Sequence, residues 1–155
     1  MALFRKSSQQ EPTPDSPALL FRDLSRDTTI KFLWAHQEKI LDEYHSEHLN
    51  QKDLAIELPT GSGKTLVGLL IGEFRRRVKH ERVVFVCPNR QLATQVSDQA
   101  QKYGISFSLL VGRQREYDQS AFLKYQQGKG IAITTYSGIF NTNPNIDDHQ
   151  CIVSD

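Results

Sequence analysis

Apolar positions along this chain follow two alternating patterns. Segments with apolar residues at helical spacing alternate with short, nearly continuous apolar runs of the kind that form buried strands. The pattern predicts helices at residues 28–48, 64–80, 90–103 and 117–128, with a helical turn at 136–140. It predicts strands at DLAIEL (53–58), RVVFVC (82–87), SFSLLVG (106–112), GIAITT (130–135) and QCIVS (150–154).

Strands that alternate with helices favour a parallel sheet whose faces are both covered by helices and whose crossovers are right-handed. We therefore expect an α/β fold with a doubly wound parallel sheet. In such folds ligands bind at the carboxyl ends of the strands.

The beginning of the chain has a different composition. Residues 7–18, SSQQEPTPDSPA, hold three of the six prolines and almost no apolar side chain. Such a segment buries too little apolar surface to offset its chain entropy. We expect a flexible N-terminal tail over residues 1–27 and a single domain over residues 28–155.

Composition narrows the class of protein. With 38% hydrophobic and 24% charged residues the chain resembles an ordinary globular protein, and its net charge of +1 offers no general attraction for nucleic acid. The apolar run in MALFRK is too short for a secretory signal. No segment reaches the length of about 18 consecutive apolar residues that a membrane span requires. The sequence therefore favours a cytoplasmic protein without membrane contact.

The stretch LPTGSGKT, residues 58–65, lies between a predicted strand and a predicted helix. Gly61 and Gly63 allow the backbone to curl around a phosphate, Lys64 supplies a positive charge, and Thr65 supplies a hydroxyl for Mg²⁺. Leu58 stands where the general phosphate-loop pattern has its first glycine. A turn that merely linked strand and helix would not need Lys-Thr at the helix start.

Four further segments accompany this loop in a fixed order: CPNRQLATQ (87–95), VG (111–112), ITTYSGIF (133–140) and IVSD (152–155). Together with LPTGSGKT they resemble motifs I, Ia, Ib, Ic and the start of motif II of superfamily 2 helicases, the DEAD/DEAH-like group. The resemblance runs from Trp34 to Asp155. It implies a RecA-like P-loop NTPase domain, incomplete at its C-terminus, that uses ATP and Mg²⁺ and acts on DNA or RNA.

The resemblance also implies roles for individual residues. Lys64 and Asp155 would be catalytic, and Thr65 and Asp155 would hold Mg²⁺. The nucleotide-binding residues would be Gln37, which recognises adenine in this family, and Thr60, Gly61, Ser62, Gly63, Lys64 and Thr65. The alternative for Gln37 is a surface helix residue. Many relatives carry arginine where this chain has Trp34, which we expect to pack in the core.

Nucleic-acid contacts are expected at the carboxyl ends of three strands, where they would touch phosphates without reading sequence. The residues are Pro88, Asn89, Arg90, Gln91, Gln95, Gly112, Arg113, Thr134, Thr135 and Tyr136. Each has a plainer alternative as a helix start or β-former, and it is their convergence on one sheet edge that favours a nucleic-acid track. The basic run RRRVKHER (75–82) is expected to be a solvated helix end. His36, His45 and His48 have no acidic or cysteine partner at metal spacing, so no zinc site is expected.

The last residue, Asp155, begins a motif whose following glutamate is not in this chain, and the second RecA-like domain is missing as well. In this family a further strand normally lies between the motif II strand and the glycine-loop strand. We therefore expect this chain to bind ATP without being a competent motor. A non-catalytic nucleotide-binding or regulatory fragment and a small NTPase or kinase of another lineage remain alternatives, and DNA versus RNA stays open.

Overall fold

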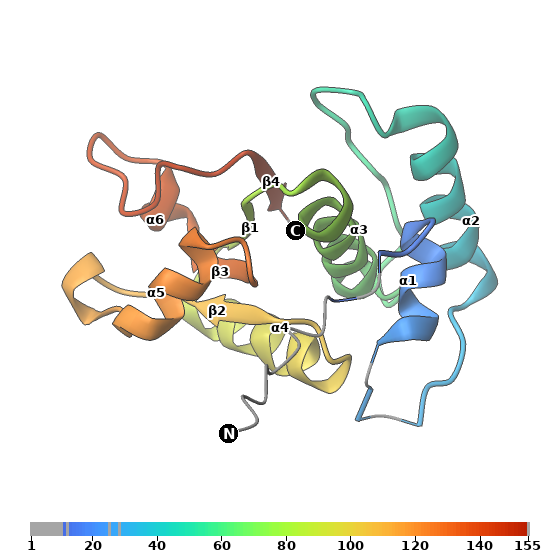
Figure 1. The fold of residues 1–155 in the computed structure, drawn as a ribbon, viewed down its shortest axis with the longest axis horizontal. Helices are drawn as coiled ribbons and strands as arrows, with labels where there is room; N and C mark the ends of the chain where they lie inside the picture. Colours follow the sequence, from blue (N-terminus) through green and yellow to red (C-terminus); the bar gives the residue numbers. More distant parts are fainter. Residues whose placement is uncertain (1–10, 12, 25, 28, 155) are drawn as a thin grey trace, which may run out of the picture.

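A parallel sheet of four strands forms the centre of the computed structural model (Figure 1), which describes residues 11, 13–24, 26–27 and 29–154. The strands are β1 (Val83–Cys87), β2 (Phe107–Leu109), β3 (Ile131–Thr135) and β4 (Cys151–Ser154), in the spatial order β2-β3-β1-β4. Val84 is opposite both Ala132 and Ile152, and every strand pair is parallel. The predicted parallel α/β fold is confirmed.

Helices cover both faces of this sheet. Helices α3 (Lys64–Lys79) and α4 (Arg90–Lys102) pack on one face, while α5 (Gln119–Gln126) and the short α6 (Tyr136–Ile139) lie on the other. Each face has its own hydrophobic core: the first core lies under α3 and α4, and the second core lies under α5 and α6. Because side chains alternate along a strand, Val83 and Phe85 of β1 belong to the first core and Val84 belongs to the second. None of the helices in the described part of the chain is long and apolar enough to cross a membrane.

The predicted N-terminal tail is wrong for residues 16–24. Helix α1 (Pro17–Asp23) forms there, with Ser16 as its cap, because the Leu19 N–H donates to Ser16 Oγ at 3.2 Å. Leu20 and Phe21 are buried against the core that contains α3. The prediction failed because the proline-rich composition of residues 7–18 outweighed the apolar residues of the short helix that follows. Of the rest of the predicted tail, residues 1–10, 12 and 25 lie outside the described part.

Helix α2 (Ala35–Glu43) begins later than the apolar spacing predicts and continues into a π-helical turn, η1 (Tyr44–His48). The side chain of Gln37 turns back, and its Oε1 accepts a hydrogen bond from the Trp34 N–H at 3.0 Å, which starts the helix at Ala35. Trp34 is 55% exposed, so the expectation that it packs in the core is wrong.

The strand predicted at residues 53–58 is absent, and this segment runs without a strand partner. Leu54 and Ile56 are 39% and 38% exposed. A groove of about 660 Å³, with α3 contributing Val67, lies between the segment and β4. An apolar run becomes a strand only where a neighbour completes its hydrogen-bond ladder, and β4 pairs with β1 alone among the described strands.

The basic run at the end of α3 is also not the solvated helix end that the sequence predicted. Glu73 is fully buried and accepts hydrogen bonds from Arg76 Nη2 at 2.6 Å and Arg77 Nε at 2.7 Å. Arg76 donates in addition to the Gly128 carbonyl at 3.0 Å. Arg76 therefore ties α3 to the loop after α5, because a buried guanidinium requires a partner for its charge and its N–H groups.

Removing the charge of Glu73 should destabilise the fold. Glu73→Gln leaves two arginines short of a buried counter-ion, and breaking such a pair costs about 3–5 kcal/mol of unfolding free energy. Urea unfolding followed by circular dichroism measures the effect, with Asp98→Asn, which neutralises an exposed acid on α4, as the matched control. Equal unfolding midpoints for the two variants would contradict the assignment.

Candidate functional site

The glycine loop joins the extended segment 53–58 to α3 in a conformation that glycine permits. Gly61 and Gly63 both have φ of +77°, in the left-handed region that favours glycine. Gly63 immediately precedes α3, and a Cβ atom there would clash with the amide nitrogen of Gln37. At Gly61 the surroundings are open, so only the backbone conformation calls for glycine.

Helix α2 holds the middle of this loop. The Ser62 carbonyl accepts one hydrogen bond from His36 Nε2 at 2.9 Å and another from Gln37 Nε2 at 3.1 Å. Because a carbonyl oxygen only accepts, His36 carries its proton on Nε2 in this arrangement. Both donors point the Ser62 carbonyl towards α2, which fixes the course of the loop. His36 was missed by the sequence analysis, which considered it only as a metal ligand.

Gln37 is buried, so the alternative of a surface helix residue is wrong. Its amide caps α2 and fastens the loop at the same time. Contact with adenine stays a prediction.

Lys64 and Thr65 form the first turn of α3, where the unpaired N–H groups and the helix dipole favour an anion. Lys64 is exposed, as is Thr60, while Thr65 is half-buried. Ser62 is buried, and its Oγ finds no hydrogen-bond partner within the described residues. The first turn of α3 therefore presents the cation of Lys64 and the hydroxyl of Thr65. Asp155 lies outside the described residues.

The segment that follows β1 carries exposed polar residues at the carboxyl end of the sheet. Asn89 caps α4, since its Oδ1 accepts from the Leu92 N–H at 2.9 Å. The side chains of Pro88, Arg90 and Gln91 are exposed around this helix start, and Gln95 is exposed one turn later. This geometry fits the predicted phosphate contacts and does not itself test them.

The loop after β2 reaches the same place. Gly112 has φ of +84°, and a Cβ atom on it would lie 3.1 Å from Arg90 Nη2. The predicted residues of two separate motifs thus lie side by side, as expected of strands that end at one sheet edge. The same Cβ would lie 2.6 Å from Glu116 Oε2, a carboxylate that the sequence analysis did not single out.

At the end of β3 the three predicted contact residues differ in exposure. Thr134 is fully buried, so its predicted nucleic-acid contact is wrong for the side chain in this structure. It faces Gly138, where a Cβ would lie 2.5 Å from Thr134 Oγ1. Thr135 is also largely buried and shares a hydrogen bond of 3.0 Å with Ser137. Tyr136 is exposed, and its hydroxyl lies 3.2 Å from Ser154 Oγ on β4.

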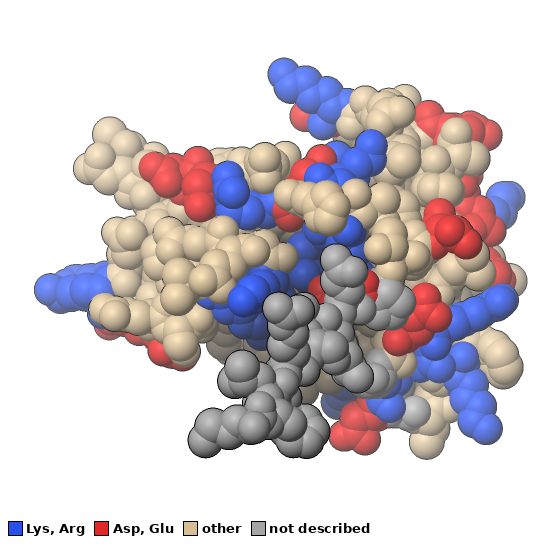
Figure 2. Space-filling view, in the orientation of Figure 1, with Lys and Arg blue, Asp and Glu red and all other residues tan. Residues whose placement is uncertain are grey.

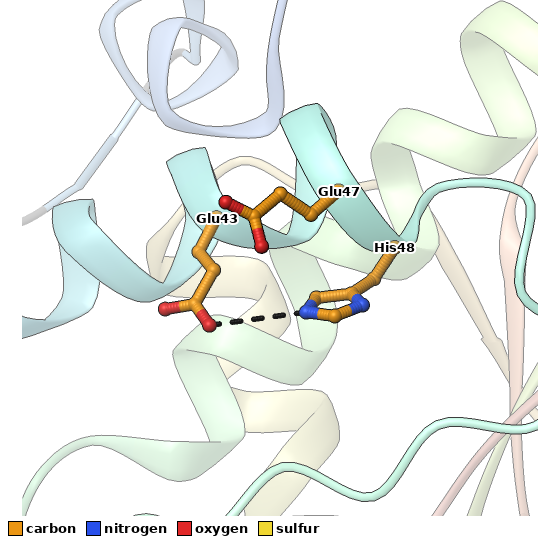
Figure 3. Close-up of side chains that lie close together, drawn as sticks. All are labelled: Glu43, Glu47 and His48. Atoms are coloured by element: carbon orange, nitrogen blue, oxygen red, sulfur yellow. Dashed lines mark ion pairs between the residues drawn. The ribbon is translucent and has the colours of Figure 1, made fainter.

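The surroundings of His48 differ from those that the sequence predicted. His48 was expected to lack acidic partners, yet Glu43, Glu47 and His48 bring their ligand atoms within 4.8 Å of one another (Figure 3). The π-helical turn η1 causes this, since it brings residues five apart onto one side, and His48 Nε2 lies 3.8 Å from Glu43 Oε1. Both carboxylates are exposed to solvent, so the contact with His48 contributes little to stability.

Comparison with known proteins agrees with this arrangement. A family model described as DEAD/DEAH box helicase matches residues 34–155. DEAD-box ATP-dependent RNA helicase 18 of Oryza sativa subsp. japonica is 33% identical over 113 residues, which are 64% of this chain and 17% of that protein. DEAD-box ATP-dependent RNA helicase CshC of Bacillus cereus is 39% identical over 57 residues, 36% of this chain and 15% of that protein.

The aligned segments thus span less than a fifth of the length of these curated relatives. The family model, in contrast, covers most of this chain and contains the glycine loop, the α4 start and the loop at Gly112. The chain belongs to the DEAD/DEAH box helicase family.

Proposed function

We propose that this chain is the ATP-binding part of a superfamily 2 helicase or translocase. The observation that carries the proposal is the glycine loop, held by His36 and Gln37 in an open curve at the start of α3. A curve of this kind directs backbone N–H groups at a phosphate, and the helix start adds its positive end.

The residues of the loop fit a magnesium nucleotide. Lys64 is exposed at the point where the β and γ phosphates would lie, and the Thr65 hydroxyl would bind Mg²⁺, with Asp155 as the proposed second ligand. The unpartnered Ser62 Oγ adds a buried donor beside the cradle. Bound Mg²⁺ would neutralise phosphate charge. Gln37 is the proposed adenine contact, because it borders the loop from the α2 side.

The nucleic acid is proposed to lie along the carboxyl edge of the sheet. Arg90 and the Gly112 loop meet there, with Tyr136 exposed at the end of β3. The contacts are to the phosphate backbone, so binding would not depend on base sequence. Both curated relatives are named RNA helicases, and this supports RNA as the strand that is bound.

Hydrolysis coupled to strand remodelling is proposed for a protein of the length of these relatives. For the 155 residues alone we propose binding of ATP without motor activity. The two binding events are separately measurable on this chain.

Lys64→Ala should weaken binding of Mg-ATP at least about tenfold, because a hydrogen bond to a charged group is worth about 1.5–3 kcal/mol. Titration with a fluorescent ATP analogue measures the dissociation constant. Lys39→Ala, which removes an exposed lysine from α2, is the matched control and should bind like the parent chain. A Lys64→Ala variant as tight as this control would remove the lysine from the phosphate site.

Arg90→Ala should weaken binding of single-stranded RNA by a similar factor for unrelated sequences. The slope of log affinity against log salt should become shallower by about 0.7 for each lost phosphate contact. Fluorescence anisotropy at several salt concentrations measures both quantities. The control is Lys102→Ala, which removes a cation from the far end of the same helix. A loss confined to one RNA sequence would show that Arg90 contacts bases instead.

A further inference from the structure

The Ser62 carbonyl has two hydrogen-bond donors, and they differ in what else they do. Gln37 Nε2 donates to it at 3.1 Å, while Gln37 Oε1 also starts α2 by accepting from the Trp34 N–H. His36 Nε2 donates at 2.9 Å, and among the hydrogen bonds of the described residues the His36 ring takes part in this one alone. The contact with the loop is therefore the distinctive feature of His36.

This contact sets the orientation of one peptide group. A trans peptide is planar, so its C=O and its N–H point in opposite directions. Because the Ser62 carbonyl is held towards α2, the Gly63 N–H points away from α2. Gly63 is the cap and Lys64 the first residue of α3, so their N–H groups have no acceptor inside the helix and suit an anion.

The peptides on either side are fixed within the loop and α3. The Pro59 carbonyl accepts from the Ser62 N–H at 3.1 Å, and the Gly63 carbonyl accepts from the Val67 N–H at 3.3 Å. The carbonyl between them depends on the donors of α2. Glycine adopts either sign of φ at little cost, so without these donors the Ser62–Gly63 peptide can turn over. Its oxygen would then face the phosphate and repel it.

The charge of the molecule does not compensate for a misplaced peptide. Figure 2 shows Lys and Arg side chains interspersed with Asp and Glu over the face in view, and the net charge of the chain is only +1. Attraction of a polyphosphate therefore depends on the groups of the loop itself, including the direction of its N–H groups.

We propose that His36 is a positioning residue for the phosphate site: its Nε2–H holds the Ser62 carbonyl on the α2 side, so that the Gly63 N–H faces the bound polyphosphate. This inference rests on the proposed function, and it deepens it by adding a residue that acts through the backbone of the loop. Because His36 acts on the phosphate cradle, its contribution is the same for polyphosphates with and without a base.

His36→Phe should weaken binding of Mg-ATP about three- to tenfold, because the loop loses one of its two outside hydrogen bonds. His36 is exposed, so the change leaves the core intact, and the phenyl ring can keep the contact with the Trp34 ring, whose centroid lies 5.5 Å away. Mg-tripolyphosphate, which has no base, should lose the same factor. Isothermal titration calorimetry measures both dissociation constants, and thermal melting checks that the variant is folded.

His36→Gln is the matched variant, since the amide nitrogen of glutamine lies at about the place of Nε2 and can donate to the Ser62 carbonyl. It should restore most of the affinity for both ligands. A second measurement is independent of any variant: NMR of the ¹⁵N-labelled free chain should find the His36 ring proton on Nε2. A proton on Nδ1 alone would contradict the contact.

The outcomes separate this inference from the proposed function. Equal losses for the two ligands with His36→Phe, recovered by His36→Gln, support the positioning role. Parent-like binding by His36→Phe, unequal losses for the two ligands, or a loss that His36→Gln shares overturns the role and leaves the proposed ATP binding intact. If the parent chain binds neither ligand, the proposed function is overturned, and the role of His36 with it.

Discussion

The geometry of the candidate site depends on one carbonyl group. The Ser62 carbonyl receives hydrogen bonds from His36 and Gln37, two neighbouring residues of α2. Gln37 also starts that helix by accepting from the Trp34 N–H, and it leaves no room for a side chain on Gly63. One amide therefore couples the start of α2 to the start of α3. This coupling shapes the loop before any phosphate arrives, which lowers the cost of ordering it on binding.

The sheet arranges the remaining candidate residues. The carboxyl ends of parallel strands lie at one edge of the sheet. Arg90 and Gly112, which are far apart in the sequence, therefore lie side by side there. At the third strand end the structure selects among the predicted residues, since Thr134 turns inward to fill the space beside Gly138 and Tyr136 turns outward. The edge thus carries the proposed strand contacts.

The sequence predicted those elements whose apolar pattern alone determines them. Strands β1 and β3 are buried on both faces, so continuous apolar runs identified them. Pattern could not show that residues 53–58 lack a strand partner, because strand pairing depends on neighbours distant in sequence. It also could not show that Glu73 and Arg76, although only three residues apart, form their ion pair in the interior, because their burial depends on what packs against α3. His36 was missed because its contact with the Ser62 carbonyl joins residues far apart in sequence, and Glu116 was missed because its contact is a local turned-back side chain that residue type alone does not reveal.

The central claim is that the loop held by α2 is where a nucleotide phosphate binds. The most direct test follows the backbone amide resonances of ¹⁵N-labelled chain while Mg-ATP is added. The account predicts saturable shifts of the amides of Gly61, Gly63 and Lys64, together with the side-chain signals of His36 and Gln37, which share the Ser62 carbonyl. Amides of Gly61, Gly63 and Lys64 that stay unshifted while Mg-ATP is added would contradict it.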